Sequence, residues 1–188
     1  MLFAIVLAAG ASSRFGATKQ LARVGGETMV LRAVRSAEAV CAAQTVLVTG
    51  KDWREVAAAC EPLQGFMARN TEFRDGLSSS IRAGIGSVRE VAAAVLLVLA
   101  DQPLVTPGHL HNLAQAWRLA PERIVASGYA GISGPPVIFP RDLFAPLMSL
   151  HGDRGARKVI EANRDRLTVI DFPPAATDID RPADLGNL

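Results

Sequence analysis

The sequence predicts a single α/β domain with a mostly parallel sheet and helices on both of its faces. Two continuous apolar runs, Leu2–Ala8 and Ala94–Leu99, are typical of strands that are buried on both sides. Segments with helical spacing alternate with short strand-like runs, which is the pattern of a parallel sheet. The length of 188 residues suits one domain, and no repeat or linker divides it.

The expected strands are short, apolar and rich in β-branched residues. Ligands of open α/β sheets bind at the carboxyl ends of the strands, so the loops after the two most apolar strands matter most. In chain order the expected strands are Leu2–Ala8, Thr45–Thr49, Gly65–Arg69, Ala94–Leu99, Arg123–Ser127, Pro136–Phe139 and Leu167–Ile170.

The expected helices lie between these strands, and three of them have a start signal. Asp52 can cap one helix, Ser78 or Ser79 can begin another, and Thr106 precedes a proline at a first helical position. The expected helices are Met29–Val40, Asp52–Cys60, Ser78–Glu90, Pro107 to about Leu119, Leu143–Leu147 and Gly155–Ala162.

The composition excludes several classes of protein. Hydrophobic residues make up 49% of the chain, which excludes a disordered chain. A net charge of +2 and 5% aromatic residues argue against a nucleic-acid or membrane partner. The apolar start, residues 1–9, is shorter than the ~20 residues of a membrane span. We therefore expect a soluble cytoplasmic protein.

The two cysteines and the basic residues are distributed unevenly. Cys41 and Cys60 form no Cys-x-x-Cys pair, and we interpret them as small buried side chains of a reduced protein, with a disulfide left open. Residues 1–35 are locally basic, which fits a small anionic ligand better than a polymer. The basic residues there are Arg14, Lys19, Arg23, Arg32 and Arg35, against Glu27 alone.

The loop after the first strand has the parts of a triphosphate cradle. It reads Leu7-Ala8-Ala9-Gly10-Ala11-Ser12-Ser13-Arg14-Phe15-Gly16-Ala17-Thr18-Lys19. Small residues let backbone N–H groups approach an anion, and Arg14 and Lys19 add positive charge. The spacing fits neither a Walker A loop nor a G-x-G-x-x-G fingerprint. A glycine-rich turn with solvated Arg14 and Lys19 remains the alternative.

Acidic residues stand at two further places where a cation could bind. Asp101 ends a buried strand, where a lone carboxylate is costly unless a cation offsets its charge. Asp178 and Asp180 would point the same way on an extended segment. Mg²⁺ prefers one or two carboxylates together with substrate phosphates. The alternative is that these residues, with Asp184, only cap turns.

The first loop resembles the signature of the nucleotidyltransferases related to molybdenum cofactor synthesis. The matching pattern is Leu7-Ala8-Ala9-Gly10-x-Ser12-x-Arg14-Phe15-Gly16-x-x-Lys19, and the resemblance extends from Leu2 to Leu185. It implies a Rossmann-like fold of the nucleotide-diphospho-sugar transferase type. It also implies a nucleoside triphosphate bound by Leu7, Ala8, Ala9, Gly10, Ser12, Arg14 and Lys19. Ala-Ala-Gly resembles the cytidylyltransferase branch, which favours CTP over GTP.

The same resemblance implies the metal and the catalytic residues. Asp101-Gln102-Pro103 resembles the family's Asp-x-Pro motif, whose Asp holds Mg²⁺. The ending from Asp178 to Leu185 resembles the family's Asp-Ile-Asp-Thr-Pro-Glu-Asp-Leu and implies a second metal contact at Asp180. The implied catalytic residues are Arg14, Lys19 and Asp101.

The resemblance also divides the chain into a nucleotide-binding half, about 1–105, and an acceptor-binding half, about 106–188. It implies that Asn70, Gly76 and Ser80 contribute to base and ribose recognition. The stretch 152–157 matches the family's Gly-Asp-x-Gly-Ala-Arg and implies that Asp153, Arg154 and Arg157 meet a phosphorylated pterin. Pro135 stands where the family usually has His, which leaves the acceptor's identity open.

The function implied is transfer of CMP from CTP to the phosphate of molybdopterin, with release of pyrophosphate. The product would serve a molybdenum hydroxylase or its maturation chaperone. Four alternatives stay open: GTP as donor, another phosphorylated acceptor, a non-catalytic nucleotide- or cofactor-binding chaperone, and a nicotinamide-dependent oxidoreductase. The missing G-x-G-x-x-G counts against the last of these.

Overall fold

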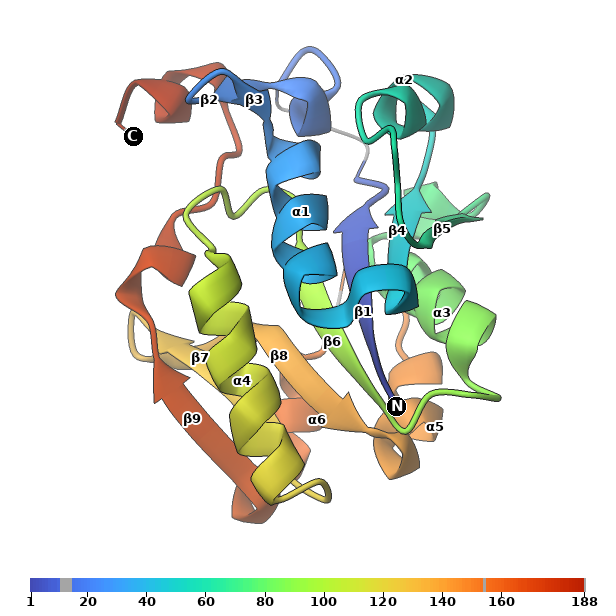
Figure 1. The fold of residues 1–188 in the computed structure, drawn as a ribbon, viewed down its shortest axis with the longest axis vertical. Helices are drawn as coiled ribbons and strands as arrows, with labels where there is room; N and C mark the ends of the chain where they lie inside the picture. The colour runs from blue at the N-terminus through green and yellow to red at the C-terminus, as the bar shows by residue number, and fades with distance from the viewer. Residues whose placement is uncertain (11–14, 154, 188) are drawn as a thin grey trace.

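The computed structural model describes residues 1–10, 15–153 and 155–187, and within them the main sheet has seven strands (Figure 1). Their order across the sheet is β5-β4-β1-β6-β8-β7-β9. In chain order the strands are β1 Leu2–Ala8, β4 Thr45–Thr49, β5 Phe66–Arg69, β6 Ala94–Leu99, β7 Ile124–Tyr129, β8 Ile132–Pro140 and β9 Leu167–Asp171.

The sheet is parallel except for β8, which runs antiparallel to both of its neighbours. At the centre, Val6 of β1 lies opposite Leu47 on one side and Val98 on the other. The strand order reverses between β1 and β6, which is where open α/β sheets bind their ligands. The predicted fold class is therefore confirmed.

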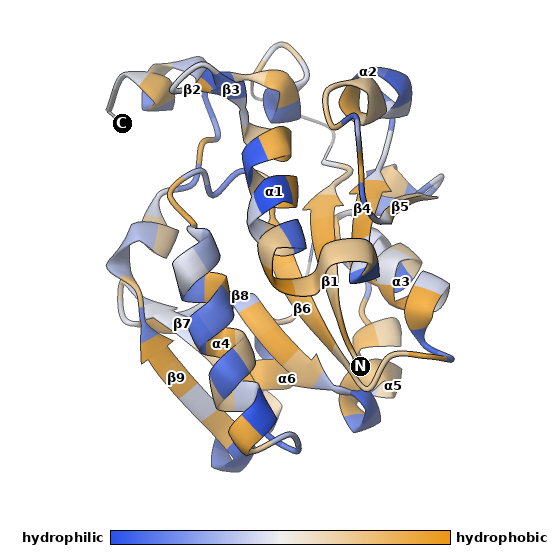
Figure 2. Cartoon of the chain, in the orientation of Figure 1, coloured by the Kyte–Doolittle hydropathy of each residue, from blue (hydrophilic) through white to orange (hydrophobic). Residues whose placement is uncertain are grey.

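Helices cover both faces of the sheet (Figure 1). Helices α1 (Met29–Cys41) and α4 (Pro107–Leu119) lie on one face, and α3 (Leu77–Val88), α5 (Phe144–Met148) and α6 (Arg157–Ala162) lie on the other. Alternate residues of β1 face opposite layers, so that Val6 packs with the α1 side and Ile5 with the α3 side. Figure 2 shows the resulting apolar strands between the helices.

Four helices begin one or two residues away from the predicted start, namely α2, α3, α5 and α6, and the cause is clearest for α3 and α2. Helix α3 begins at Leu77, directly after Gly76, and not at Ser78 or Ser79. Gly76 adopts φ 84° and ψ −172°, a conformation that only glycine tolerates well, and so it sets where the helix starts. Asp52 precedes α2 (Trp53–Ala58) but does not cap it, because its carboxylate accepts a hydrogen bond from Thr18 Oγ1 at 2.6 Å.

A small hairpin was not predicted. Its strands β2 (Arg23–Val24) and β3 (Glu27–Thr28) are only two residues long, too short to show a sequence pattern. Cys41 and Cys60 are both buried and free, which confirms the interpretation of small core side chains. Across the described ranges, none of the helices has the length and apolar character needed to cross a membrane.

Candidate functional site

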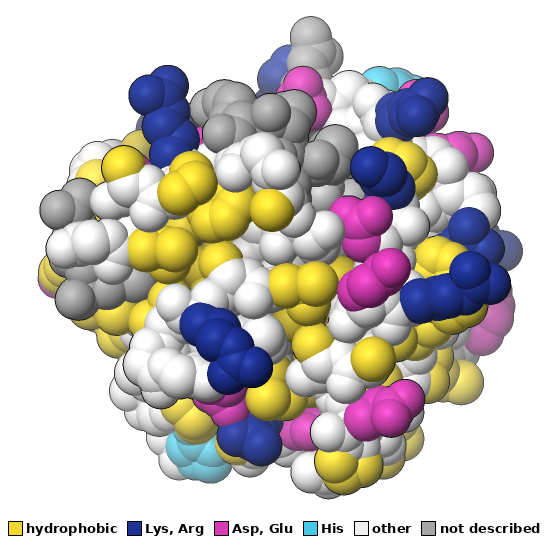
Figure 3. Space-filling model, turned by 90° about the horizontal axis from the view of Figure 1, so that it is seen from above, with side chains coloured by type: hydrophobic (Ala, Val, Ile, Leu, Met, Phe, Trp, Pro, Cys, Tyr) yellow, Lys and Arg dark blue, Asp and Glu magenta, His cyan; other side chains and the backbone are white. Residues whose placement is uncertain are grey.

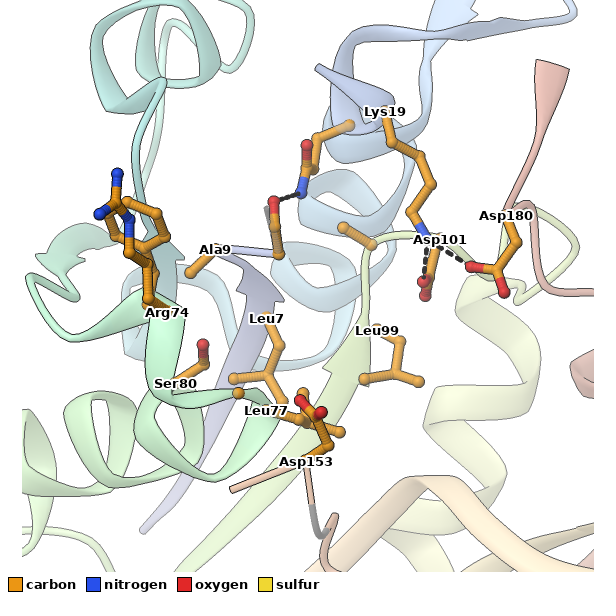
Figure 4. Close-up of a pocket in the computed structure, with 15 residues that line it drawn as sticks. Leu7, Ala9, Lys19, Arg74, Leu77, Ser80, Leu99, Asp101, Asp153 and Asp180 are labelled. Carbon is orange, nitrogen blue, oxygen red and sulfur yellow. Dashed lines mark hydrogen bonds and ion pairs between the residues drawn. The ribbon is translucent and has the colours of Figure 1, made fainter. Parts of the chain in front are cut away.

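A pocket of about 390 Å³ opens at the carboxyl ends of β1 and β6 (Figure 4). This volume lies in the range of small-molecule sites. Figure 3 looks down on this end of the molecule and shows acidic and basic side chains beside an exposed apolar area. The described lining residues are Leu7, Ala9, Gly10, Lys19, Gln20, Phe73, Arg74, Gly76, Leu77, Ser80, Leu99, Ala100, Asp101, Asp153 and Asp180.

Lys19 joins three distant segments of the chain on one side of this pocket. It lies in the short 3₁₀ helix Lys19–Leu21, and its Nζ is 2.8 Å from Asp101 Oδ2 and 3.0 Å from Asp180 Oδ1. The Lys19 side chain is 12% exposed, against 29% for Asp101 and 46% for Asp180. Burial lowers the pKa of Lys19, but the charges and hydrogen bonds of the two aspartates raise it further. Lys19 therefore stays positively charged.

Asp180 owes its position to backbone contacts near the end of the chain. Ile179 N–H donates to Asp101 O at 3.0 Å and places the two segments side by side. The Asp184 carboxylate accepts from the backbone N–H of Asp180 at 2.9 Å and of Arg181 at 2.7 Å. The capping role considered for the C-terminal acids therefore belongs to Asp184, while the Asp180 side chain faces Lys19.

Asp178 adds to the crowding of negative charge. Partial burial raises its pKa to about 6, and the charges of Asp101 and Asp180 raise it as well, against the opposing effects of Gln102 and Lys19. The negative charges of this cluster therefore disfavour the ionised form of Asp178.

The residues fit a hard divalent cation. Asp101 and Asp180 already share one cationic group, the Lys19 ammonium, and both offer carboxylate oxygens. Within the described ranges no group of three or more His, Cys, Asp or Glu side chains is placed to hold a metal. A cation held by these two carboxylates would need further oxygen ligands, and substrate phosphates are the usual source for Mg²⁺.

The opposite side of the pocket rests on neutral hydrogen bonds around α3. The buried Asn70 side chain donates to Ser79 Oγ at 2.8 Å and to Ser80 Oγ at 3.1 Å, and its Oδ1 accepts from Glu72 N–H. Ser79 Oγ in turn donates to Gly76 O at 2.8 Å. These bonds fix the first turn of α3 and hold Ser80 at the pocket surface.

The segment around Gly152 is tied to the same helix. Ser78 Oγ donates to Gly152 O at 2.7 Å, and Arg82 donates to Leu150 O at 2.7 Å. A Cβ on Gly76 would lie 2.4 Å from Asp153 Oδ1, so only glycine permits this close approach. Asp153 thereby enters the pocket beside Leu77, far from it in sequence (Figure 4).

The structure brings most of the predicted site residues together. Three described residues that were predicted do not line the pocket. Ala8 and Asn70 are buried behind the lining, and Arg157 forms a 2.9 Å ion pair with Glu161. Ser12, Arg14 and Arg154 lie outside the described residues. The predicted residues that line the pocket are Leu7, Ala9, Gly10, Lys19, Gly76, Ser80, Asp101, Asp153 and Asp180.

Six lining residues were not predicted. Gln20 follows Lys19 and donates to Gly10 O at 2.9 Å, which ties the ends of the first loop together. Leu99 and Ala100 could have been predicted from the sequence, because they directly precede Asp101 at the end of β6. Phe73, Arg74 and Leu77 come from the turn before α3 and its first residue, where no local pattern marked them.

The fold and the pocket define a class, the α/β nucleotidyltransferases. The chain belongs to the family described as the MobA-like NTP transferase domain, whose model matches residues 4–167. This membership confirms the family resemblance seen in the sequence and the Rossmann-like fold that it implied.

Individual relatives agree with this assignment. The chain is 26% identical over 171 residues to the purine catabolism protein PucB of Bacillus subtilis (strain 168), covering 87% of this chain and 82% of that protein. It is similar to Rv0371c of Mycobacterium tuberculosis H37Rv, with a TM-score of 0.84, 29% identity, and coverage of 99% and 96% of the two chains. A second Rv0371c structure, in complex with manganese, matches with a TM-score of 0.78 and 26% identity, covering 99% and 96%.

A more distant structure shares the fold alone. The molybdopterin-guanine dinucleotide biosynthesis protein A of Archaeoglobus fulgidus has a TM-score of 0.67 and 17% identity, covering 100% of this chain and 96% of that one.

Proposed function

We propose that this protein transfers CMP from CTP to the phosphate of molybdopterin and releases pyrophosphate. The observation that carries the proposal is the Lys19 ammonium held between Asp101 and Asp180 in the pocket at the β1/β6 switch point. Membership of the MobA-like family supports the transfer of a nucleotide. The Ala9-Gly10 pair supports CTP as the donor, by the resemblance described above.

In this proposal the two halves of the chain have different tasks. Residues 1–105 bind the nucleotide, and Gly10, Gly76 and Ser80 contact it from the pocket lining. Arg14 and Lys19 neutralise the negative charge of the nucleotide's phosphates. Residues 106–188 bind the acceptor and contribute Asp153 and Asp180 to the shared pocket. The product would pass to a molybdenum hydroxylase or to its maturation chaperone.

The proposed reaction is a single displacement at phosphorus. A phosphate oxygen of the acceptor forms a bond to the α-phosphorus of CTP, and the bond from that phosphorus to the oxygen bridging to the β-phosphorus breaks. Pyrophosphate leaves with the bonding electrons. The chain's own contribution is to align the two substrates and to place the positive charge of Lys19 where negative charge collects.

Asp101 and Asp180 would hold Mg²⁺ in this scheme. The ion, when bound, supplies Lewis acidity and a template for phosphate oxygens. The oxygen-only ligand set supports this assignment, as does the manganese complex of the similar protein Rv0371c. Since Lys19 pairs with both carboxylates, its ammonium has to share them with the ion or turn toward the substrate.

The experiment that tests the proposal is a thermal-shift panel with CTP, GTP, ATP, UTP and NADH, each with and without Mg²⁺. We expect the largest increase in melting temperature with CTP and Mg²⁺ together. A preference for GTP would keep the chemistry and reject the cytidylyl assignment. A response to NADH alone would reject nucleotide transfer. Binding of CTP without pyrophosphate release in the presence of acceptor would indicate a non-catalytic carrier instead.

A further inference from the structure

Asp153 is an acid of the pocket that takes no part in the ion pairs of Lys19. It lies on the opposite side, next to Leu77 at the start of α3, whereas Asp101 and Asp180 face Lys19 (Figure 4). Within the described ranges, no hydrogen bond or ion pair reaches the Asp153 carboxylate. The side chain is exposed, so water can hydrate it before a ligand binds. A ligand that displaces this water binds well only if it brings a hydrogen-bond donor.

The backbone around Asp153 is held against α3. Gly152 O accepts from the backbone N–H of Ser78 at 3.2 Å and from its hydroxyl at 2.7 Å. A Cβ on Gly76 would lie 2.7 Å from Asp153 N and 2.4 Å from its Oδ1, and a Cβ on Gly155 would lie 3.2 Å from the first side chain of α3. The chain is therefore close to α3 on both sides of Asp153, and the carboxylate has a defined place in the pocket.

Apolar side chains line the same part of the pocket. They are Leu7, Leu77 and Leu99 (Figure 4). Leu77 and Leu99 are half-buried, so part of their surface is open to a ligand. Apolar surface with a single carboxylate suits a flat ring, because the leucines can pack against its faces while the carboxylate accepts from a donor at its edge. The hydroxyl groups of a sugar would leave much of this apolar surface without a matching contact.

The charge of Asp153 determines which part of a substrate can lie beside it. Phosphate groups are negative and are repelled by the carboxylate, whereas the Lys19 ammonium on the opposite side attracts them. A phosphorylated substrate therefore turns its phosphates toward Lys19 and a neutral part toward Asp153. That neutral part has to donate, because an aspartate carboxylate only accepts hydrogen bonds.

We propose that Asp153 accepts a hydrogen bond from the amino group of an aminopyrimidine ring and selects the substrate that carries it. Asp and Glu accept in this way from the N4 amino group of cytosine in protein–DNA complexes. A ring with a carbonyl in place of the amine turns an acceptor toward the carboxylate and binds less well. The inference rests on the proposed function, whose substrates supply two sources of this chemistry, the cytosine of CTP and the pterin of molybdopterin.

Two pairs of ligands isolate the amino group. CTP carries an amine where UTP carries a carbonyl, and 6-hydroxymethylpterin carries an amine where 6-hydroxymethyllumazine carries a carbonyl. Calorimetric titration of the intact protein gives Kd for each ligand, with Mg²⁺ present for the nucleotides. In one of the two pairs we expect the amine to bind roughly 10-fold or more tightly than the carbonyl, as for a hydrogen bond to a charged group.

The variant Asp153→Asn tests whether this preference comes from the carboxylate. It keeps the size of the side chain, but an amide can bind an amine through its oxygen or a carbonyl through its N–H. The preference should therefore nearly vanish, while the free energy of unfolding in urea stays the same. The matched control is Asp75→Asn, at an exposed aspartate beside Gly76 and outside the pocket lining, which should keep the preference.

The pair that responds identifies the source of the amine. Loss of the preference for CTP over UTP assigns the contact to cytosine, and loss of the preference for the pterin over the lumazine assigns it to the acceptor. Three results would overturn the inference: no preference for the amine in either pair, a preference that survives in Asp153→Asn, or an equal loss in both pairs. The last follows because one carboxylate cannot contact two rings that are bound at the same time.

Pyrophosphate release separates this inference from the proposed function. A protein that releases pyrophosphate, but whose ligand preferences are unchanged in Asp153→Asn, keeps the proposed function and loses the inference. A protein that releases none, but whose preference for the amine depends on Asp153, keeps the amine contact and loses the transfer reaction.

Discussion

The two sides of the pocket hold their residues by different forces. The charged wall, formed by Lys19, Asp101 and Asp180, is joined by ion pairs between partly exposed groups. The α3 wall, formed by Gly76, Ser80 and Asp153, rests on neutral hydrogen bonds and on close backbone packing.

This difference indicates two tasks. Ion pairs at partly exposed positions add little stability, typically up to ~1 kcal/mol, so the charged wall can exchange partners when a charged substrate enters. Buried neutral hydrogen bonds are costly to break, and they fix a shape. We infer that the charged wall serves the chemistry and the α3 wall serves positioning. The following predictions test that division.

The largest effect is expected from Lys19→Ala on the charged wall. Turnover, measured as pyrophosphate release, should fall by ~10²–10³-fold, as for loss of one electrostatic group that stabilises a transition state. The free energy of unfolding should change by only about 1 kcal/mol, because the ion pairs are partly hydrated. The matched control is Lys51→Ala, which removes an exposed lysine outside the pocket lining and should leave turnover unchanged.

Gly76→Ala, on the α3 wall, should mainly lower the free energy of unfolding, whereas Lys19→Ala mainly lowers turnover. Alanine would be forced into a conformation that glycine alone adopts readily, and its Cβ would clash with Asp153 and Gly152. We expect a loss of about 3 kcal/mol in the free energy of unfolding in urea. Gly86→Ala in the same helix meets no atom within 4 Å and should instead stabilise by about 1 kcal/mol. Equal responses of the two variants would contradict the rigid role of the α3 wall.

The third prediction concerns a buried histidine between α4 and β7. His109 of α4 is buried, stacks on Phe172 with ring centroids 3.9 Å apart, and contacts Ser127 Oγ through Nε2 at 2.7 Å. Burial lowers its pKa to about 4, below the unfolded value of 6.5. The contribution of His109 to stability is therefore fully present above pH 6.5 and is lost as the pH drops from there toward 4, because the unfolded chain binds the proton first.

The slope expected from His109 is about 1.4 kcal/mol per pH unit across that range. Urea unfolding at several pH values measures it. In His109→Gln this part of the slope should disappear, whereas His151→Gln, at an exposed histidine, should keep it. A slope that persists in His109→Gln would assign the acid sensitivity to another group.

The smallest effect is expected from Asp184→Ala. This change removes the acceptor for two backbone N–H groups beside Asp180 and should cost about 1 kcal/mol of stability. It should also weaken the thermal shift by CTP and Mg²⁺, because the Asp180 segment loses its anchor. Asp165→Ala, at an exposed aspartate, serves as the control. An undiminished thermal shift in Asp184→Ala would show that Asp180 keeps its position without this support.

The sequence predicted the sheet well because its signals are local. Continuous apolar runs marked β1 and β6, and the Thr106 cap of α4 is confirmed by its hydrogen bond from His109 N–H at 3.2 Å. The presence of Asp101 at the end of β6 followed from the same reasoning.

The contacts that complete the site could not be predicted locally. Lys19 meets partners 82 and 161 positions away in the chain. The start of α3 depends on the approach of Gly76 to Asp153, which is a tertiary contact that no helix-capping rule contains. The sequence suggests Ser78 or Ser79 as the residue that begins α3. In the structure their hydroxyls instead donate to Gly152 O and Gly76 O.

The most direct test of the account is pyrophosphate release when molybdopterin is added to the protein with CTP and Mg²⁺. We predict one pyrophosphate for each molybdopterin converted, faster with CTP than with GTP, and a large loss of rate in Asp101→Asn. A rate no higher than without protein, or a rate unchanged in Asp101→Asn, would contradict transfer at the Lys19–Asp101–Asp180 cluster.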